Sequence, residues 1–245
     1  MTLSMLRQLP SPSPVAFVLV VALAAAGCAA EPPQPFEANV EVAFLDRIDD
    51  LEDGDDAILA LGFRQGFWYA FNGLTPGALQ SPALMLFTTT PGGPSGKGAC
   101  ARSYGQGFES WGAGMGLDFN DTGETTPTGM TKRAPYDASA YKGIAFAARG
   151  TSRMRFAVST AAVESTMGGG TCVGGIGNVG CADSHGVDIP LTPEWRTYSV
   201  PFDRLTQEGF GMRVAFDVKK TMAIHFSVPA GQPFDYAIDD VGFFR

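Results

Sequence analysis

From residue 44 onward the chain is a series of short β-prone runs separated by turns, and none of it has the pattern of a long amphipathic helix. The clearest run is 153–159, in which Arg153 and Arg155 alternate with apolar residues, as in a strand with one exposed face. The 31 glycines and 17 prolines supply the turns. The pattern therefore predicts an all-β domain over residues 44–245, a two-sheet antiparallel β-sandwich of the jelly-roll kind. The other predicted strands are 63–72, 83–90, 99–104, 111–119, 143–149, 195–202, 222–228 and 234–244.

The first 27 residues have the features of a secretory signal peptide and are excluded from the fold. One positive charge, Arg7, precedes an apolar run of 12 residues at 15–26, which is too short for a membrane helix of about 20 residues. The sequence around Cys28 resembles a bacterial lipobox, which predicts that Cys28 is lipidated and anchors the mature protein. Residues 28–43 then form a proline-rich tether. The alternative is ordinary secretion after cleavage at a nearby A-x-A-like site.

The charge distribution argues against nucleic acid or anionic lipid as a partner. The formal net charge is −8, and the sequence contains no cluster of lysines and arginines. No second hydrophobic span follows the first, so membrane attachment would rest on Cys28 alone. We expect an exported protein that is lipid-anchored in the bacterial cell envelope, at the outer membrane or the surface, and otherwise secreted.

Two of the remaining cysteines are predicted to form a disulfide, as an oxidising compartment permits. Cys172 and Cys181 lie in a glycine-rich loop and would close a small ring. The alternative, a metal site, has only His185 as a nearby further ligand and lacks the paired spacing that zinc prefers. Cys100 is expected in a strand as a small buried apolar residue.

Acidic residues are concentrated at both ends of the predicted domain. Seven of the eleven residues from Asp46 to Asp56 are acidic, and the last predicted strand contains the pair Asp239 and Asp240. This pattern suggests that the two ends lie side by side and share a cation, and oxygen ligands of this kind are those that Ca²⁺ prefers. Without a cation the crowded charges would oppose the compact state. The alternative is a solvated acidic edge.

The order of six motifs resembles the galactose-binding-like jelly-roll domains of carbohydrate-binding modules, nearest to family 11, over about residues 44–245. The motifs are IDDLEDGD at 48–55, GFWY at 66–69, WGAGM at 111–115, YDASAYKGIAF at 136–146, EWRTYSVPF at 194–202 and IDDV at 238–241. The resemblance implies two antiparallel sheets, a structural Ca²⁺ and a concave face that binds β-glucan-like chains. Carried over, the calcium site would fall on the segment from Asp49 to Asp53 and on Asp239 or Asp240, with Glu52 and Asp240 as the favoured side chains.

A sugar-binding face needs flat aromatic rings, and Trp68, Tyr69 and Trp111 are the available platforms. Residues 67, 69 and 71 of one strand share a face and 68 and 70 the other, so Trp68 and Tyr69 cannot both face a ligand. Glycines 112, 114 and 116 would likewise share one strand face and leave it bare. The alternative for each ring is a place in the core, where we also expect Trp195. His225 lies in an apolar strand and is expected to be buried and structural.

The sequence disfavours an enzyme, because nothing in it pairs two carboxylates across a bond and it has neither a G-x-S-x-G motif nor a phosphate-binding glycine loop before a helix. The favoured function is a non-catalytic carbohydrate-binding module of an exported lipoprotein, with a polysaccharide or oligosaccharide as ligand. The alternative is a cell-surface scaffold that uses the same fold without sugar binding. Two of the rings exposed in one groove would favour the first, and rings that are all buried would favour the second.

Overall fold

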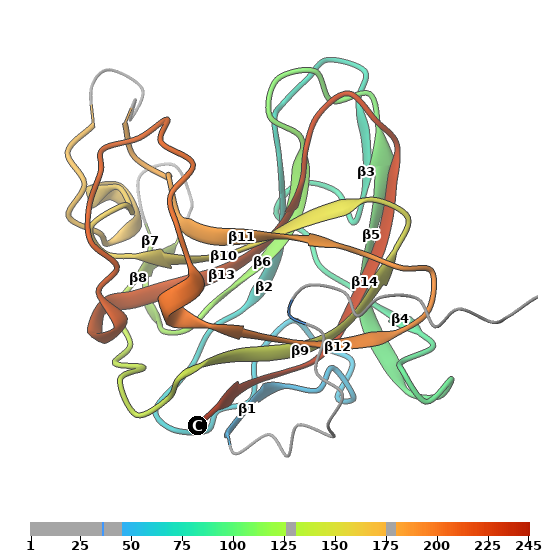
Figure 1. Ribbon diagram of the computed structural model, residues 1–245, viewed down its shortest axis with the longest axis horizontal. Coiled ribbons are helices and arrows are strands. Elements are labelled where there is room, and N and C mark those ends of the chain that lie inside the picture. The colour runs from blue at the N-terminus through green and yellow to red at the C-terminus, as the bar shows by residue number, and fades with distance from the viewer. Residues whose placement is uncertain (1–35, 37–45, 126–130, 175–179) are drawn as a thin grey trace, which may run out of the picture. The chain divides into compact units, whose positions relative to one another are not determined.

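Two antiparallel sheets form the domain, which confirms the predicted all-β sandwich (Figure 1). The computed structural model describes residue 36 and residues 46–125, 131–174 and 180–245. The predicted signal peptide (1–27), Cys28 and the tether to residue 43 lie outside these residues, apart from Phe36. No helix within the described residues is long and apolar enough to cross a membrane.

The larger sheet has the order β12-β9-β14-β5-β3, with β1 paired to β14 and β4 paired to β5. The smaller sheet has the order β11-β10-β13-β6-β2, and a separate hairpin pairs β7 with β8. The strands of the larger sheet are β1 (Asp46–Asp49), β3 (Leu79–Ser81), β4 (Thr89–Pro91), β5 (Ala99–Gln106), β9 (Gly143–Gly150), β12 (Arg196–Pro201) and β14 (Phe234–Phe244). The other strands are β2 (Trp68–Asn72), β6 (Ala113–Asp118), β7 (Asp121–Thr125), β8 (Thr131–Arg133), β10 (Arg153–Thr160), β11 (His185–Pro190) and β13 (Thr221–Val228). Short 3₁₀ helices within the described residues are Thr166–Gly168, Phe202–Arg204 and Val218–Lys220.

The core lies between the two sheets and follows from the strand alternation. In β10 the apolar Met154, Phe156 and Val158 are fully buried, whereas Arg155 between them reaches the opposite face. The ring of Phe156 lies 5.1 Å from that of Phe146 on the other sheet. Burying each such side chain contributes about 1.5–3 kcal/mol. The alternation therefore turns the face of β10 that carries Arg155 away from the core, where it can contact a ligand.

The two ends of the domain lie side by side, as the acidic motifs predict. Strand β1 pairs antiparallel with β14, with Asp46 opposite Phe243 and Asp49 opposite Val241. The buried Arg64 reinforces this pairing, because its Nη2 donates to Asp46 Oδ1 at 2.7 Å and to the carbonyl of Arg47 at 2.7 Å.

One predicted strand is wrong. The apolar run 83–90 is a turn followed only by the short β4, and Met85 has a positive φ of 64° that no strand accommodates. The turn bonds to the edge strand β2, because the N–H of Ala70 donates to the carbonyl of Leu86 and the N–H of Met85 donates to the carbonyl of Ala70. The apolar run therefore covers a sheet edge that would otherwise be open.

Candidate functional site

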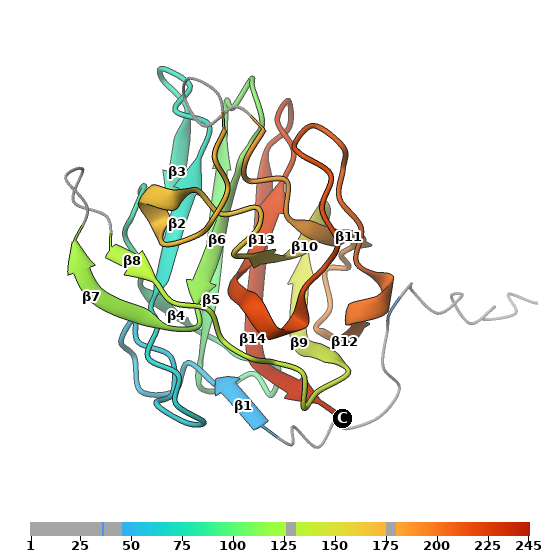
Figure 2. The same ribbon diagram turned by 90° about the vertical axis from the view of Figure 1, so that its left-hand side faces the viewer.

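The outer face of the smaller sheet, the face turned away from the core, carries aromatic, glycine and charged residues side by side. Adjacent strands place Tyr69 opposite Gly116 and Phe71 opposite Gly114, while Ser227 lies opposite Arg155. Figure 2 shows β7 and β8 beside one side of this sheet, where they cover part of the face. The rest of the face is the candidate site.

Trp68 does not belong to this face, and its prediction as a ligand platform is wrong. Its side chain is only 2% exposed and lies in the core, with its ring 5.3 Å from Phe87 and 6.1 Å from Phe226. Its Nε1 donates a 2.6 Å hydrogen bond to Asp49 Oδ2. The strand alternation correctly places Trp68 and Tyr69 on opposite faces, and the packing of the second sheet decides that Trp68 is the inner one.

Trp111 and Tyr69 do lie on the same face, joined by a ring that the sequence analysis did not select. Trp111 is 54% exposed, and its ring is stacked 6.0 Å from that of Phe71. Phe71 in turn lies 6.3 Å from Tyr69. The exposed Phe67 extends the row by the same alternation. The signal was present in the sequence, since 67, 69 and 71 share one face of β2.

The glycines of β6 let these rings lie directly on the backbone. A Cβ on Gly114 would come within 2.6 Å of the ring of Phe71, and one on Gly116 within 2.8 Å of His225 and 3.1 Å of Tyr69. The predicted bare strip therefore exists at Gly114 and Gly116, but aromatic side chains of the neighbouring strands fill it.

A groove runs between Trp111 and a charged wall on β10, β11 and the loop before Gly209. It encloses about 110 Å³, and Ser227 lies in its floor. Arg155 organises the wall, since its guanidinium lies 3.6 Å from Asp188 and 3.7 Å from Glu208, and Nη2 donates to the carbonyl of Thr206 at 2.7 Å. The groove thus has an aromatic side, and opposite it a side of hydrogen-bonding groups whose charges largely cancel.

His225 lies in the same face between the aromatic row and β10, where its neighbours cover it, as expected for a buried structural histidine. Its ring lies 5.3 Å from that of Phe71, and its Nε2 is 3.1 Å from the hydroxyl of Tyr69. Burial of the ring, together with the charge of Arg133, lowers the pKa of His225 to about 3. The imidazole is therefore neutral at physiological pH.

The covered part of the face is held by a buried ion cluster around Arg133 of β8. Its guanidinium contacts Asp118 of β6 at 3.0 Å and Glu164 at 2.9 Å. Burial raises the pKa of Asp118 to about 6, against the opposing effect of Arg133. The cluster ties the β7–β8 hairpin and the Glu164 segment to the sheet, so these carboxylates are structural and are not open to a ligand.

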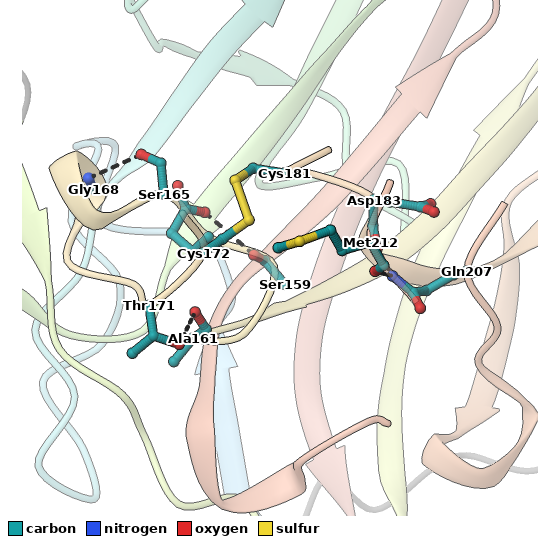
Figure 3. Close-up of a disulfide and its surroundings, with 11 residues drawn as sticks. Ser159, Ala161, Ser165, Gly168, Thr171, Cys172, Cys181, Asp183, Gln207 and Met212 are labelled. Atoms are coloured by element: carbon teal, nitrogen blue, oxygen red, sulfur yellow. Dashed lines mark hydrogen bonds between the residues drawn. A yellow bond between two sulfur atoms is a disulfide. The ribbon is translucent and has the colours of Figure 1, made fainter. Parts of the chain in front are cut away.

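The predicted disulfide is confirmed, with Cys172 and Cys181 joined at 2.10 Å (Figure 3). Two residues beyond it, the buried carboxylate of Asp183 accepts hydrogen bonds from the N–H groups of Glu208, Gly209 and Gly211. The N–H of Met212 also donates to the carbonyl of Gly180. The disulfide segment therefore supports the loop that brings Glu208 to the groove. Cys100 is buried and free, as expected for a small apolar residue in a strand.

The acidic residues predicted to bind metal separate into two groups. Asp49 is buried and used structurally, since it accepts from Trp68 and from the N–H of Leu51. Burial raises the pKa of Asp49 to about 6, although these two hydrogen bonds act in the opposite direction. Asp53 is exposed, and its Oδ1 accepts from the N–H of Asp55 at 3.4 Å.

The second group is centred on the buried Asp239. Its burial, and then the nearby Asp240, Glu52 and Asp50, raise its pKa to about 7. Its Oδ1 accepts from the N–H of Asp240, and Glu52 Oε1 accepts from the N–H of Ala99 at 3.3 Å. Among the described residues no group of three or more acidic, histidine or cysteine side chains stands at metal-ligand geometry.

Comparison with known proteins gives a likeness of fold. No family model matches the sequence, and no curated protein matches it. A family 11 carbohydrate-binding module of the cellulosomal cellulase Lic26A-Cel5E of Clostridium thermocellum is 16% identical, with 72% of this chain and 86% of the module covered and a TM-score of 0.45. A family 11 module of the same organism, in complex with a β-1,3-1,4-mixed-linked tetrasaccharide, is 15% identical, with 78% and 95% covered and a TM-score of 0.46. A family 30 module of the cellulosomal cellulase Cel9D-Cel44B of that organism is 14% identical, with 80% and 94% covered and a TM-score of 0.41.

Proposed function

We propose that this protein binds a polysaccharide chain, without cleaving it, in the groove on the outer face of the smaller sheet. One observation carries the proposal: the exposed Trp111 lies across a groove from Arg155, Asp188 and Glu208. An exposed ring of this size is a large apolar surface with a fixed orientation. Binding sites for small molecules combine such surfaces with a few placed polar groups.

Each side of the groove matches one part of a sugar. The indole of Trp111, supported from beneath by Phe71, offers a flat surface to the C–H face of a pyranose ring. Arg155 and the two carboxylates offer donors and acceptors to the hydroxyls. Because Arg153 and Arg155 together balance the charges of Asp188 and Glu208, a neutral saccharide would not leave an unpaired charge in the groove.

The groove is poorly arranged for hydrolysis of a glycosidic bond. A glycosidase holds two carboxylates on opposite sides of the scissile bond, one of them as a proton donor. Here Asp188 and Glu208 lie on the same wall and both contact Arg155, while the opposite side is Trp111. We therefore propose a binding function and no catalysis.

We also propose a structural Ca²⁺ near Asp239, with the carboxylates of Glu52, Asp239 and Asp240 as its ligands, which would have to move to reach metal-ligand geometry. The donor chemistry fits this ion, because oxygen ligands of carboxylates and carbonyls are what Ca²⁺ takes. Only Oδ1 of Asp239 receives a hydrogen bond from the described residues, and a Cβ on Gly93 would come within 2.5 Å of its Oδ2. The ion would offset the burial, and after it the repulsion from neighbouring carboxylates, that raise the pKa of Asp239 and of Asp240.

We propose further that the protein is exported and lipid-anchored through Cys28. The disulfide between Cys172 and Cys181 supports an oxidising compartment. Metabolic labelling with a fatty acid tests the anchor, with Cys28→Ser as the matched variant. Label that persists in Cys28→Ser would contradict it.

A glycan array of the folded protein in the presence of Ca²⁺ tests the binding function. We expect binding to one class of neutral polysaccharide. If a folded sample binds no glycan on the array, the carbohydrate function is wrong and the scaffold function becomes the better account.

A further inference from the structure

A second cavity lies on the outer face of the larger sheet, on the other side of the core from the groove. It is open to solvent on one side and has a volume of about 200 Å³. The lining residues that matter here are Arg102, Arg149, Thr151, Asp235 and Ala237. Nothing in the proposed groove function uses these residues.

The strand register places two arginines on either side of a small residue. Ala237 of β14 lies opposite Arg102 of β5 on one side and opposite Arg149 of β9 on the other. Partners in adjacent strands have their Cβ atoms about 4.5–5.5 Å apart, and they project on the same face. Ala237 has only a methyl group, and the side chains of Arg102 and Arg149 line the same pocket from either side of it.

Only one of the two arginines is neutralised. Arg102 forms a two-pronged ion pair with Asp235, with Nε to Oδ1 at 2.9 Å and Nη2 to Oδ2 at 2.6 Å. Arg149 instead lies over the ring of Trp195, with its Cζ 5.2 Å from the ring centroid. Among the described residues no carboxylate lies within ion-pair distance of Arg149. The cavity therefore carries one uncompensated positive charge, in a chain whose net charge is −8.

This arrangement orients Arg149 and explains why Trp195 is not in the core, contrary to the sequence-based expectation. Trp195 is partly exposed, and its indole supports the planar guanidinium. An arginine held flat in this way presents a fixed pair of N–H donors, which matches the two oxygens of a carboxylate. The neighbouring Asp235, ionised because its pKa is lowered by Arg102, can accept from hydroxyl groups, and Thr151 offers a further hydroxyl.

We propose that this cavity binds an acidic saccharide, one uronic acid residue whose carboxylate pairs with Arg149 and whose hydroxyls are held by Asp235 and Thr151. The volume is smaller than the roughly 300–1,000 Å³ of pockets for drug-sized ligands, so it suits a single sugar residue rather than a chain. The site does not depend on the groove, which lies on the other sheet.

Titration by two-dimensional NMR of the protein with glucuronate and galacturonate tests the site, with glucose, galactose and inorganic sulfate as comparison probes. We expect the uronates to bind with a dissociation constant in the millimolar range and to shift resonances of β5, β9 and β14. The neutral sugars should bind at least tenfold more weakly, since they lack the carboxylate. Equal binding of uronates and neutral sugars, or no binding of uronates at all, would overturn the proposal. Sulfate that binds as tightly as the uronates would overturn the saccharide assignment.

Arg149→Gln should weaken uronate binding at least tenfold, and Arg149→Lys should weaken it less, because lysine keeps the charge and loses the planar fork. Arg153→Gln is the matched control, since Arg153 is an exposed arginine that lines the groove on the other sheet. It should leave uronate binding unchanged, as should Trp111→Ala. Full uronate affinity in Arg149→Gln would contradict the proposal, and the Arg149→Lys variant keeps the test open if the glutamine variant does not fold.

Discussion

The indole Nε1 of Trp68 donates a 2.6 Å hydrogen bond to the buried carboxylate of Asp49, across the space between β2 and β1. The sequence predicts that Trp68 binds sugar and that Asp49 binds metal. Instead, the two residues are hydrogen-bond partners inside the core. The bond joins the first strand of the domain to the edge of the smaller sheet. It therefore connects the two sheets at the point where the chain enters the fold.

Trp68→Phe should destabilise the protein, because it leaves the buried Asp49 without its side-chain donor. Loss of one partner of a buried hydrogen bond costs about 1–3 kcal/mol, and the smaller ring adds a packing loss. Urea unfolding of the variant, compared with Trp111→Phe as an exposed control, measures the change. A free energy of unfolding equal to that of the wild-type protein would show that this hydrogen bond does not stabilise the fold.

The buried Asp118 should make stability fall as the pH rises. Its pKa is raised from 3.8 to about 6 by burial, so the folded state holds its proton more tightly than the unfolded state does. The contribution of Asp118 to the free energy of unfolding is then most favourable below about pH 4 and declines up to about pH 6. A shift of this size corresponds to about 1–3 kcal/mol.

The measurement is the difference in unfolding free energy between the wild-type protein and Asp118→Asn at pH 4 and pH 7. It should change by that amount between the two pH values. A difference that is the same at both pH values would contradict the raised pKa.

The disulfide should stabilise the protein by about 2–3 kcal/mol, because it closes a loop with a sequence separation of 9. The double variant Cys172→Ser with Cys181→Ser should lower the free energy of unfolding by that amount, and the melting temperature should fall accordingly. It should also weaken glycan binding, since the same segment holds the loop that carries Glu208. Cys100→Ser, which alters a free thiol, is the control for binding. If the double variant binds glycan with unchanged affinity, the disulfide does not support the groove.

Removal of Ca²⁺ should lower the melting temperature. A ligand that binds only the folded state at a hundred times its dissociation constant adds about 2.7 kcal/mol, which is about 5–11 °C for a domain of this size. Glu52→Gln and Asp240→Asn should abolish the response to EDTA, and the exposed Asp203→Asn should keep it. If EDTA does not change the melting temperature of the wild-type protein, the proposal of a structural Ca²⁺ is wrong.

The sheet architecture could be predicted because alternation and turn residues are local. The alternation in 153–159 identifies β10 and its inner face, and the acidic motifs anticipate the pairing of β1 with β14. The loop of Cys172 and Cys181 is short enough for its disulfide to follow from sequence spacing and the expected oxidising compartment. In each case the interacting residues are close in sequence or marked by the same residue type.

The groove could not be predicted, because the residues that form it are far apart in sequence. Trp111 and Arg155 come together only through the pairing of β6 with β13 and of β13 with β10. The same limitation explains Trp68, since alternation gives two opposite faces without showing which one a second sheet will cover. Trp195 was missed for a different reason: a tryptophan can be covered by an arginine at the surface as well as by the core.

Isothermal titration of the polysaccharide found on the array, with the wild-type protein, Trp111→Ala and Trp195→Ala, tests the central claim most directly. We predict that Trp111→Ala loses binding by at least tenfold, about 1.4 kcal/mol, while Trp195→Ala binds the neutral polysaccharide like the wild-type protein. Equal affinity of Trp111→Ala and the wild-type protein, with both folded, would show that the groove is not the binding site.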